Sequence, residues 1–186
     1  MVSITALWLP ILVASVFVFV VSSLLHMVLP LHRGDYRTLP DEAGVMDALH
    51  KFNVPPGDYM MPRAGSPEAM RTPEFKAKFQ RGPVAIMTFY PPGNMGIGAS
   101  LAQWFVFLLL VNVFVAYVCG RALAPGAPYL HAFRFAGATT FMCHFLGQVP
   151  DSIWYKRNWA TTARFGVDGI VYALVTAGTF GWLWPK

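Results

Sequence analysis

Residues 97–119 read IGASLAQWFVFLLLVNVFVAYVC and contain no charged side chain. An α-helix needs about 20 consecutive apolar residues to cross the hydrocarbon core of a bilayer, so this run is long enough. Lipid offers no hydrogen-bond partners to the backbone, and runs of this length do not fit barrel strands. Three further runs pass the same length test, although polar side chains interrupt the last two: 6–31, 129–149 and 165–184. The sequence therefore predicts an all-α fold, an integral membrane four-helix bundle.

The composition favours this fold and excludes other classes of protein. Charged residues make up only 12% of the chain, against about 25% in typical soluble domains, and 55% of its residues are hydrophobic. The net charge of +5 is scattered beside apolar runs rather than gathered on one face, so we expect no nucleic-acid partner. Cys119 and Cys143 lie inside apolar runs, where we expect them to behave as small hydrophobic side chains. We expect a single membrane domain over residues 1–186.

One polar region, residues 32–96, separates the first two predicted spans. Two short helices are expected within it. The segment 38–41 resembles a capping box for the first helix, and Thr72 followed by Pro73 is typical of the start of the second. Residues 84–90 are expected to be extended.

Lysine and arginine flank the predicted spans unevenly. Cytoplasmic loops of membrane proteins carry an excess of these two residues. We therefore expect the loops after the first and third spans in the cytoplasm, and both termini in the periplasm of a bacterial inner membrane. These two loops hold eleven of the cations: Arg33, Arg37, Lys51, Arg63, Arg71, Lys76, Lys78, Arg81, Lys156, Arg157 and Arg164.

Each predicted span carries a polar group at a similar depth, near its cytoplasmic end. The ionisable groups among them are His26, His144 and Asp168. Such groups are costly in lipid and usually face the interior of a bundle. Three interpretations stay open: hydrogen bonds between helices, a site for a transition metal or haem, and the handling of protons or substrate.

Of these interpretations we expect hydrogen bonding, with no cofactor. A metal held by His26 and His144 needs a third ligand, and Asp168 already has Arg164 four residues before it as an ion-pair partner. For haem, the nearest cation in the third span is Arg134. It lies about 15 Å along the helix from His144, too far to pair with a propionate of the same haem.

Two further patterns concern helix packing. Asn112 lies about 180° around its helix from Gln103. If Gln103 faces the bundle interior, Asn112 faces outward, where only a partner subunit could satisfy its amide. Small residues also recur every four positions along the last predicted span, so a neighbouring helix of this bundle or of another protein could approach closely: Gly169, Ala173, Ala177 and Gly181.

Several stretches of the chain resemble a family of small bacterial four-span membrane proteins to which no activity is assigned. The resemblance covers about the latter two-thirds of the sequence. It implies the four-span fold and brings no catalytic residues. The stretches that carry it are 73–79 with 82–83, 100–106, 151–154, 168–174 and 179–184.

The motifs of soluble enzymes are missing from the sequence. It has no Walker loop, dinucleotide fingerprint, HExxH or CxxC, so an enzyme is not favoured. We expect a non-enzymatic accessory or assembly subunit of a larger membrane complex. Its partners would be lipid and other membrane subunits, or further copies of itself. The alternatives are a small metal- or haem-binding redox protein using His26 and His144, and a small oligomeric transporter.

Overall fold

The computed structural model describes residues 1–93 and 96–186 of a mostly helical chain. Asn94 and Met95, which belong to the predicted polar region, lie outside the described residues. The chain divides into two compact units. The first comprises Met1–Arg37 and Gly96–Lys186, and the second is Thr38–Met95.

Four long helices build the first unit: α1 (Trp8–Ser23), α4 (Gly98–Ala122), α5 (Tyr129–His144) and α7 (Trp159–Trp182). A short helix, α6 (Val149–Trp154), precedes α7. Among the described residues, the helical stretches Ile4–Val28 and Gly98–Ala122 are long and apolar enough to cross a membrane. The helix α5 has only 16 residues, and α7 carries glycines, threonines and a carboxylate that lower its hydropathy.

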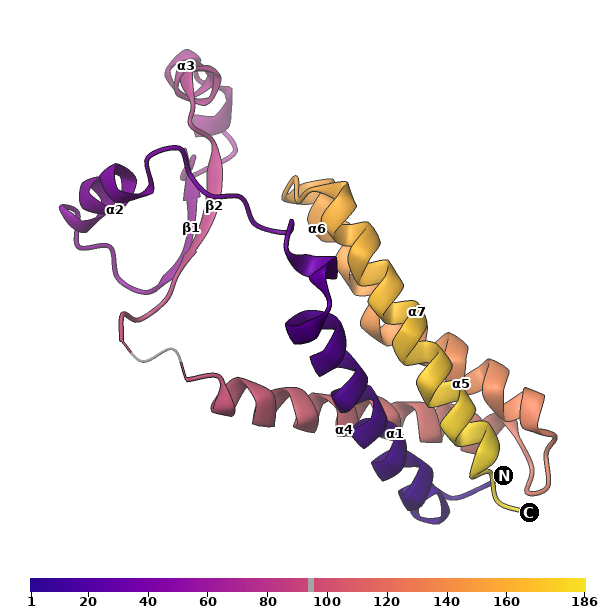
Figure 1. The fold of residues 1–186 in the computed structure, drawn as a ribbon. Helices are drawn as coiled ribbons and strands as arrows, with labels where there is room; N and C mark the ends of the chain where they lie inside the picture. The colour runs from indigo at the N-terminus through magenta and orange to yellow at the C-terminus, as the bar shows by residue number, and fades with distance from the viewer. Residues whose placement is uncertain (94–95) are drawn as a thin grey trace. The chain divides into compact units, whose positions relative to one another are not determined.

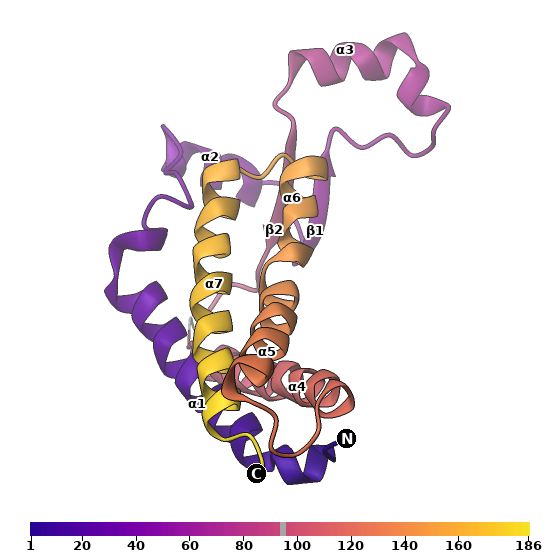
Figure 2. The same cartoon turned by 90° about the vertical axis from the view of Figure 1, so that its right-hand side faces the viewer.

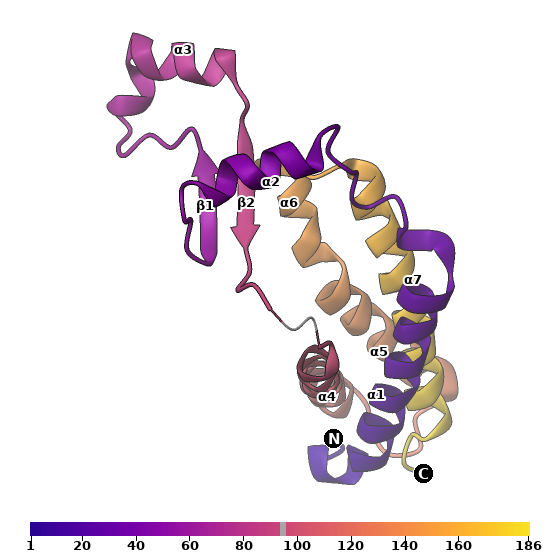
Figure 3. The same cartoon turned by 60° about the vertical axis from the view of Figure 1, so that its left-hand side comes forward.

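These four helices form a ring in which each packs on two others. α1 contacts α4 and α7, and α5 contacts the same two helices. α4 crosses the other three at a steep angle, so that Figure 3 looks almost along it while α1, α5 and α7 are seen from the side. The inclination separates the first turns of α4 from the rest of the ring.

Both chain ends lie at one end of this ring (Figures 1 and 2). The backbone N–H of Val2 donates to the carbonyl of Gly120 at the end of α4, over 2.8 Å. The N–H of Gly126, in the turn between α4 and α5, donates to the carbonyl of Pro185, also over 2.8 Å. The N-terminus, this turn and the C-terminus are therefore held together.

Apolar side chains lie both between the helices, where they form two buried clusters, and on the outward faces of the helices. Hydroxyl and amide side chains are buried between the helices, among them Ser15, Asn112 and Thr176. Large apolar side chains point outward from all four helices, including the less apolar α5 and α7, with Phe135 and Leu174 as examples. Burying polar groups and exposing apolar ones is favourable when the solvent is lipid.

The predicted orientation of α4 is wrong. Asn112 is buried, and Gln103, on the opposite face of the helix, is exposed. The Asn112 side chain donates to the hydroxyl of Ser15 on α1 and to the carbonyl of Leu108. A polar partner on α1, which helical periodicity in α4 cannot reveal, decides which amide turns inward. Because Asn112 faces inward, it does not require a partner subunit.

The row of small residues on α7 lies against α5. A Cβ atom added at Gly169 would come within 2.9 Å of the Phe145 Cβ, and one added at Gly181 within 2.6 Å of the Tyr129 ring. Between them, Ala173 and Ala177 face Gly137, where an added Cβ would lie 3.2 Å from the Ala177 Cβ. Small side chains thus allow α5 and α7 to approach closely over most of their length.

The second unit contains two short helices and a two-stranded antiparallel sheet: α2 (Glu42–His50), β1 (Gly57–Met61), α3 (Pro73–Arg81) and β2 (Ala85–Phe89). The predicted start of α3 is confirmed, because the Thr72 hydroxyl accepts from the Phe75 N–H. Residues 84–90 are largely extended, as predicted. None of the described residues 38–93 is buried.

The predicted start of α2 is wrong. The helix begins at Glu42, and Asp41 caps it by accepting from the Gly44 N–H. Pro40 disfavours helical backbone at the residue before it, so the helix cannot extend back to Thr38. The carboxylate of Asp41 then replaces the threonine hydroxyl as the cap.

Candidate metal centre

The chain at the end of α1 changes its helical geometry twice. Leu24–Val28 is a π-helical turn, Leu29 is extended with φ −80° and ψ 146°, and Pro30–His32 is a 3-10 turn. This reversal brings His32 back beside His26, with ring centroids 4.1 Å apart and planes only 9° from parallel. π-Helical turns are uncommon and are often found at functional sites.

Both imidazoles face Asp168, which projects from α7. The His32 Nε2 lies 3.0 Å and the His26 Nε2 lies 3.7 Å from the Asp168 Oδ2. The Asp168 side chain is only 3% exposed, whereas that of His26 is 38% exposed. One ligand atom from each of the three residues lies within 4.8 Å of the other two. We call His26, His32 and Asp168 the triad.

A second carboxylate supports the triad from behind. The His32 Nδ1 donates to the Asp35 Oδ2 over 2.7 Å, and the Arg164 guanidinium donates to the other oxygen of Asp35. Burial acts to raise the pKa of Asp35, but the hydrogen bonds and charges of His32 and Arg164 outweigh it and hold the pKa below its usual value. The predicted ion pair between Arg164 and Asp168 is wrong, because Arg164 pairs with Asp35 instead.

The hydrogen bonds made by the two Nδ1 atoms determine whether each Nε2 atom carries a proton or a free lone pair. The His26 Nδ1 lies 3.1 Å from the Ser22 carbonyl, which can only accept, so this nitrogen carries a proton. The Nδ1 of His32 likewise donates to Asp35. In the neutral form of each ring, the Nε2 therefore offers a lone pair toward Asp168.

Three electron-pair donors thus converge at the triad. The Asp168 Oδ2 is buried and makes no hydrogen bond of normal geometry, although the His32 Nε2 reaches the neighbouring Oδ1 at 3.3 Å. A buried arrangement of this kind is satisfied by an additional proton on a histidine or by a cation between the donors. The donor set of two imidazoles and one carboxylate suits a divalent transition metal.

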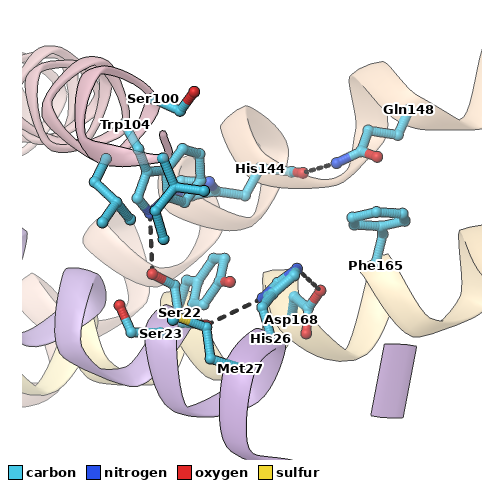
Figure 4. A pocket seen from close by; sticks show the side chains of 13 residues that line it. Ser22, Ser23, His26, Met27, Ser100, Trp104, His144, Gln148, Phe165 and Asp168 are labelled. Atoms are coloured by element: carbon cyan, nitrogen blue, oxygen red, sulfur yellow. Dashed lines mark hydrogen bonds and ion pairs between the residues drawn. The ribbon is translucent and has the colours of Figure 1, made fainter. Parts of the chain in front are cut away.

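A cavity of about 470 Å³ borders the triad (Figure 4). His26 and Asp168 line one part of it, and His32 does not line it. The other lining side chains are of two kinds. The apolar or aromatic ones are Met27, Ile97, Leu101, Trp104, Phe165 and Tyr172, and the polar ones are Ser22, Ser23, Ser100, His144 and Gln148. The triad therefore meets a cavity with a large apolar part on the side away from His32.

The structure brings together two of the three predicted site residues. His26 and Asp168 meet, whereas His144 lines the cavity elsewhere, beside Trp104 (Figure 4). The His144 ring lies among aromatic rings, 6.0 Å from that of Trp104 and 5.1 Å from that of Tyr172, centroid to centroid. His32, which follows the first apolar run, is not among the residues predicted from the sequence. Its spacing of three residues from Asp35 was the available signal.

Comparison with protein-family models, curated proteins and solved structures finds no match for this chain. Function must therefore be inferred from the geometry of the site.

Proposed function

We propose that the protein is a multi-pass membrane protein that binds one divalent transition-metal ion, best exemplified by Zn²⁺, at the triad. The closeness of three ligand atoms, one each from His26, His32 and Asp168 and all within 4.8 Å of one another, carries this proposal. It favours the metal-binding alternative over the accessory-subunit interpretation. Two features of the sequence argue against a metal, and neither does so in the folded chain. His32 supplies the third ligand, and Asp168 is free of Arg164 because Arg164 pairs with Asp35.

The separations of the donor atoms are those of a small coordination shell. Two atoms bound to tetrahedral Zn²⁺ at about 2.0–2.1 Å lie about 3.3 Å apart. The distances of 3.0 and 3.7 Å from the Asp168 Oδ2 to the two imidazoles lie on either side of this value. Three protein ligands leave a fourth position for water or another molecule, as in catalytic zinc sites.

Asp35 provides the support that metal-bound histidines usually have. A carboxylate that accepts from the second ring nitrogen fixes the tautomer and raises the basicity of the ligating one. The His32 Nδ1 makes such a bond with Asp35, which Arg164 holds in place. The two rings are stacked, so their lone pairs run side by side. Binding requires the rings to tilt toward a common centre and lose this stacking.

Four membrane crossings are supported by the way α5 and α7 complete the ring. Their outward faces carry large apolar side chains, like those of the two more apolar helices. The N-terminus, the turn after α4 and the C-terminus are hydrogen-bonded at one end, as an even number of crossings requires. Exposed aromatic rings near both ends of the helices, such as Trp8, Trp159 and Trp182, suit the two interfaces.

The test is metal stoichiometry and affinity in the purified, detergent-solubilised full chain. The apoprotein, prepared with chelator, should take up one Zn²⁺ per chain in calorimetry and in elemental analysis after desalting. Substoichiometric, nonspecific uptake would overturn the proposal. His26→Ala, His32→Ala and Asp168→Asn should each weaken zinc binding by about 100-fold or more, because each removes one of three ligands.

His144→Gln is the matched control. It removes a buried histidine from the same cavity but leaves the triad intact, so zinc affinity should stay within about twofold of wild type. An equal loss in this variant would show that the ligand set is wrong. Thermal unfolding and gel filtration of every variant separate a lost ligand from a lost fold.

A further inference from the structure

We infer that the cavity beside the triad binds a single-chain lipid-soluble carboxylate, whose head group occupies the fourth position on the metal. This inference rests on the proposed metal. It is carried by the charge of the loaded triad and by the chemistry of the cavity walls.

The loaded triad has an uncompensated positive charge. A divalent ion and the Asp168 carboxylate sum to +1, because both imidazoles must be neutral to ligate. Asp35 and Arg164 cancel each other and add nothing. With Asp168 only 3% exposed, a net charge is costly to leave unpaired. A monoanionic oxygen ligand neutralises the site.

The side from which this ligand arrives is set by the cavity. His26 and Asp168 line the cavity, whereas His32, the third member of the triad, does not. The open coordination position therefore faces the cavity of about 470 Å³, a volume within the usual range of small-molecule sites. A head group on the metal would place the rest of its molecule between α1 and the first turns of α4.

The walls of the cavity select an apolar body for this ligand. Leu101 and Ile97 from the α4 segment, Met27 from the π-helical turn and the rings of Trp104 and Phe165 form its apolar part. The polar side chains that also line it, apart from the triad, include no acid, lysine or arginine: Ser22, Ser23, Ser100, His144 and Gln148. An acyl chain gains affinity from each buried methylene, whereas a short or doubly charged anion gains nothing there. Hydroxide, the competing monoanion, would satisfy the metal but leave the cavity unused.

Cobalt substitution provides the readout. Co²⁺ in a tetrahedral site has visible absorption bands that shift when its fourth ligand is exchanged. Decanoate should shift the bands of the Co²⁺-loaded protein in detergent at a concentration at least about tenfold below that of acetate. The uncharged 1-decanol, which has the chain but not the carboxylate, should leave the bands unchanged.

A pair of variants tests the cavity itself. Leu101→Trp adds bulk to the cavity without replacing a metal ligand, and should weaken the decanoate response by about tenfold or more while cobalt still binds. Leu110→Trp adds the same ring on the same helix at a position that is 55% exposed and does not line the cavity, and should behave as wild type.

The outcomes separate this inference from the proposed function. Failure of cobalt to bind would overturn both. Normal cobalt binding, with no preference for decanoate over acetate or with an undiminished response in Leu101→Trp, would overturn only the carboxylate site and point to hydroxide as the fourth ligand.

Discussion

The side-chain amide of Asn112, midway along α4, donates a hydrogen bond of 3.0 Å to the hydroxyl of Ser15 on α1. Both side chains are buried, at 2% and 0% exposure. This bond joins the two most apolar helices of the chain and turns the face of α4 that carries Asn112 toward the other helices of the ring.

A double-mutant cycle should measure this bond. Asn112→Ala, Ser15→Ala and the double variant should show a coupling free energy of about 0.6 kcal/mol, the average for hydrogen bonds between membrane helices, and of no more than about 1.7 kcal/mol, the largest value found. Unfolding in mixed micelles provides the measurement. The oligomeric state of Asn112→Ala should equal that of wild type, because the side chain is 2% exposed and both hydrogen bonds donated by its amide nitrogen lie within the chain. A change in assembly size would restore the partner-subunit interpretation.

Substitutions along α7 should be more destabilising on the face that packs on α5 than at a position beside that face. Gly169→Leu should destabilise the protein by about 1–3 kcal/mol, because even a Cβ atom at this position would lie 2.9 Å from Phe145. Gly178→Leu is the matched control, since an added Cβ there meets only the Tyr129 hydroxyl at 3.8 Å. Thermal unfolding in detergent should show a clear decrease in midpoint for the first variant only. Equal midpoints would argue against close packing at Gly169.

The low pKa of Asp35 predicts how acid acts on the first unit. A carboxyl whose pKa is lower in the folded than in the unfolded chain stabilises the fold fully above its unfolded value, which is near 3.8. That stabilisation is lost as the pH falls further, through the folded value. Compared in chelator to exclude metal effects, wild type should unfold at a higher temperature than Asp35→Asn at pH 5–7. Below pH 3.8 the difference should shrink. A difference that does not shrink at all as the pH falls below 3.8 would mean that the pairing of Asp35 with His32 and Arg164 does not depend on its charge.

Labelling of introduced cysteines should determine the topology. In a background carrying Cys119→Ser and Cys143→Ser, Lys186→Cys should react with an impermeant maleimide in intact bacterial cells. Arg63→Cys, in the loop after the first span, should react only after permeabilisation. This pattern follows from the excess of lysine and arginine in that loop. The reverse pattern would invert the predicted orientation.

The sequence predicts the helices of the first unit better than their mutual rotation. The charge-free run 97–119 identifies α4 to within a few residues of its observed ends, since hydropathy alone decides it. Periodicity also identifies opposite faces, but not which face turns inward. For Asn112 that choice depends on a serine nearly one hundred positions earlier, the Ser15 hydroxyl.

The triad shows the same limit more sharply. Depth along the spans places His26, His144 and Asp168 at one level, but depth does not specify the angle around each helix. His144 is directed into a group of aromatic rings instead. The position of His32 could not be predicted, because it lies beyond Pro30, where the helical period of the first apolar run no longer applies. Only the reversal at Leu29 returns it to the end of α1.

The π-helical turn Leu24–Val28 makes the triad sensitive to the length of the chain. A π-helical turn accommodates an additional residue without moving the helix on either side of it. Removing one residue, such as Leu25, would restore α-helical spacing within the turn and move His26, which lies inside it, back by one position, a rotation of about 100° around the axis of α1. His26 would then move away from Asp168, although the gene would still encode both residues. A one-codon deletion is thus the smallest genetic change that would abolish the histidine pair while keeping all three triad residues in the gene.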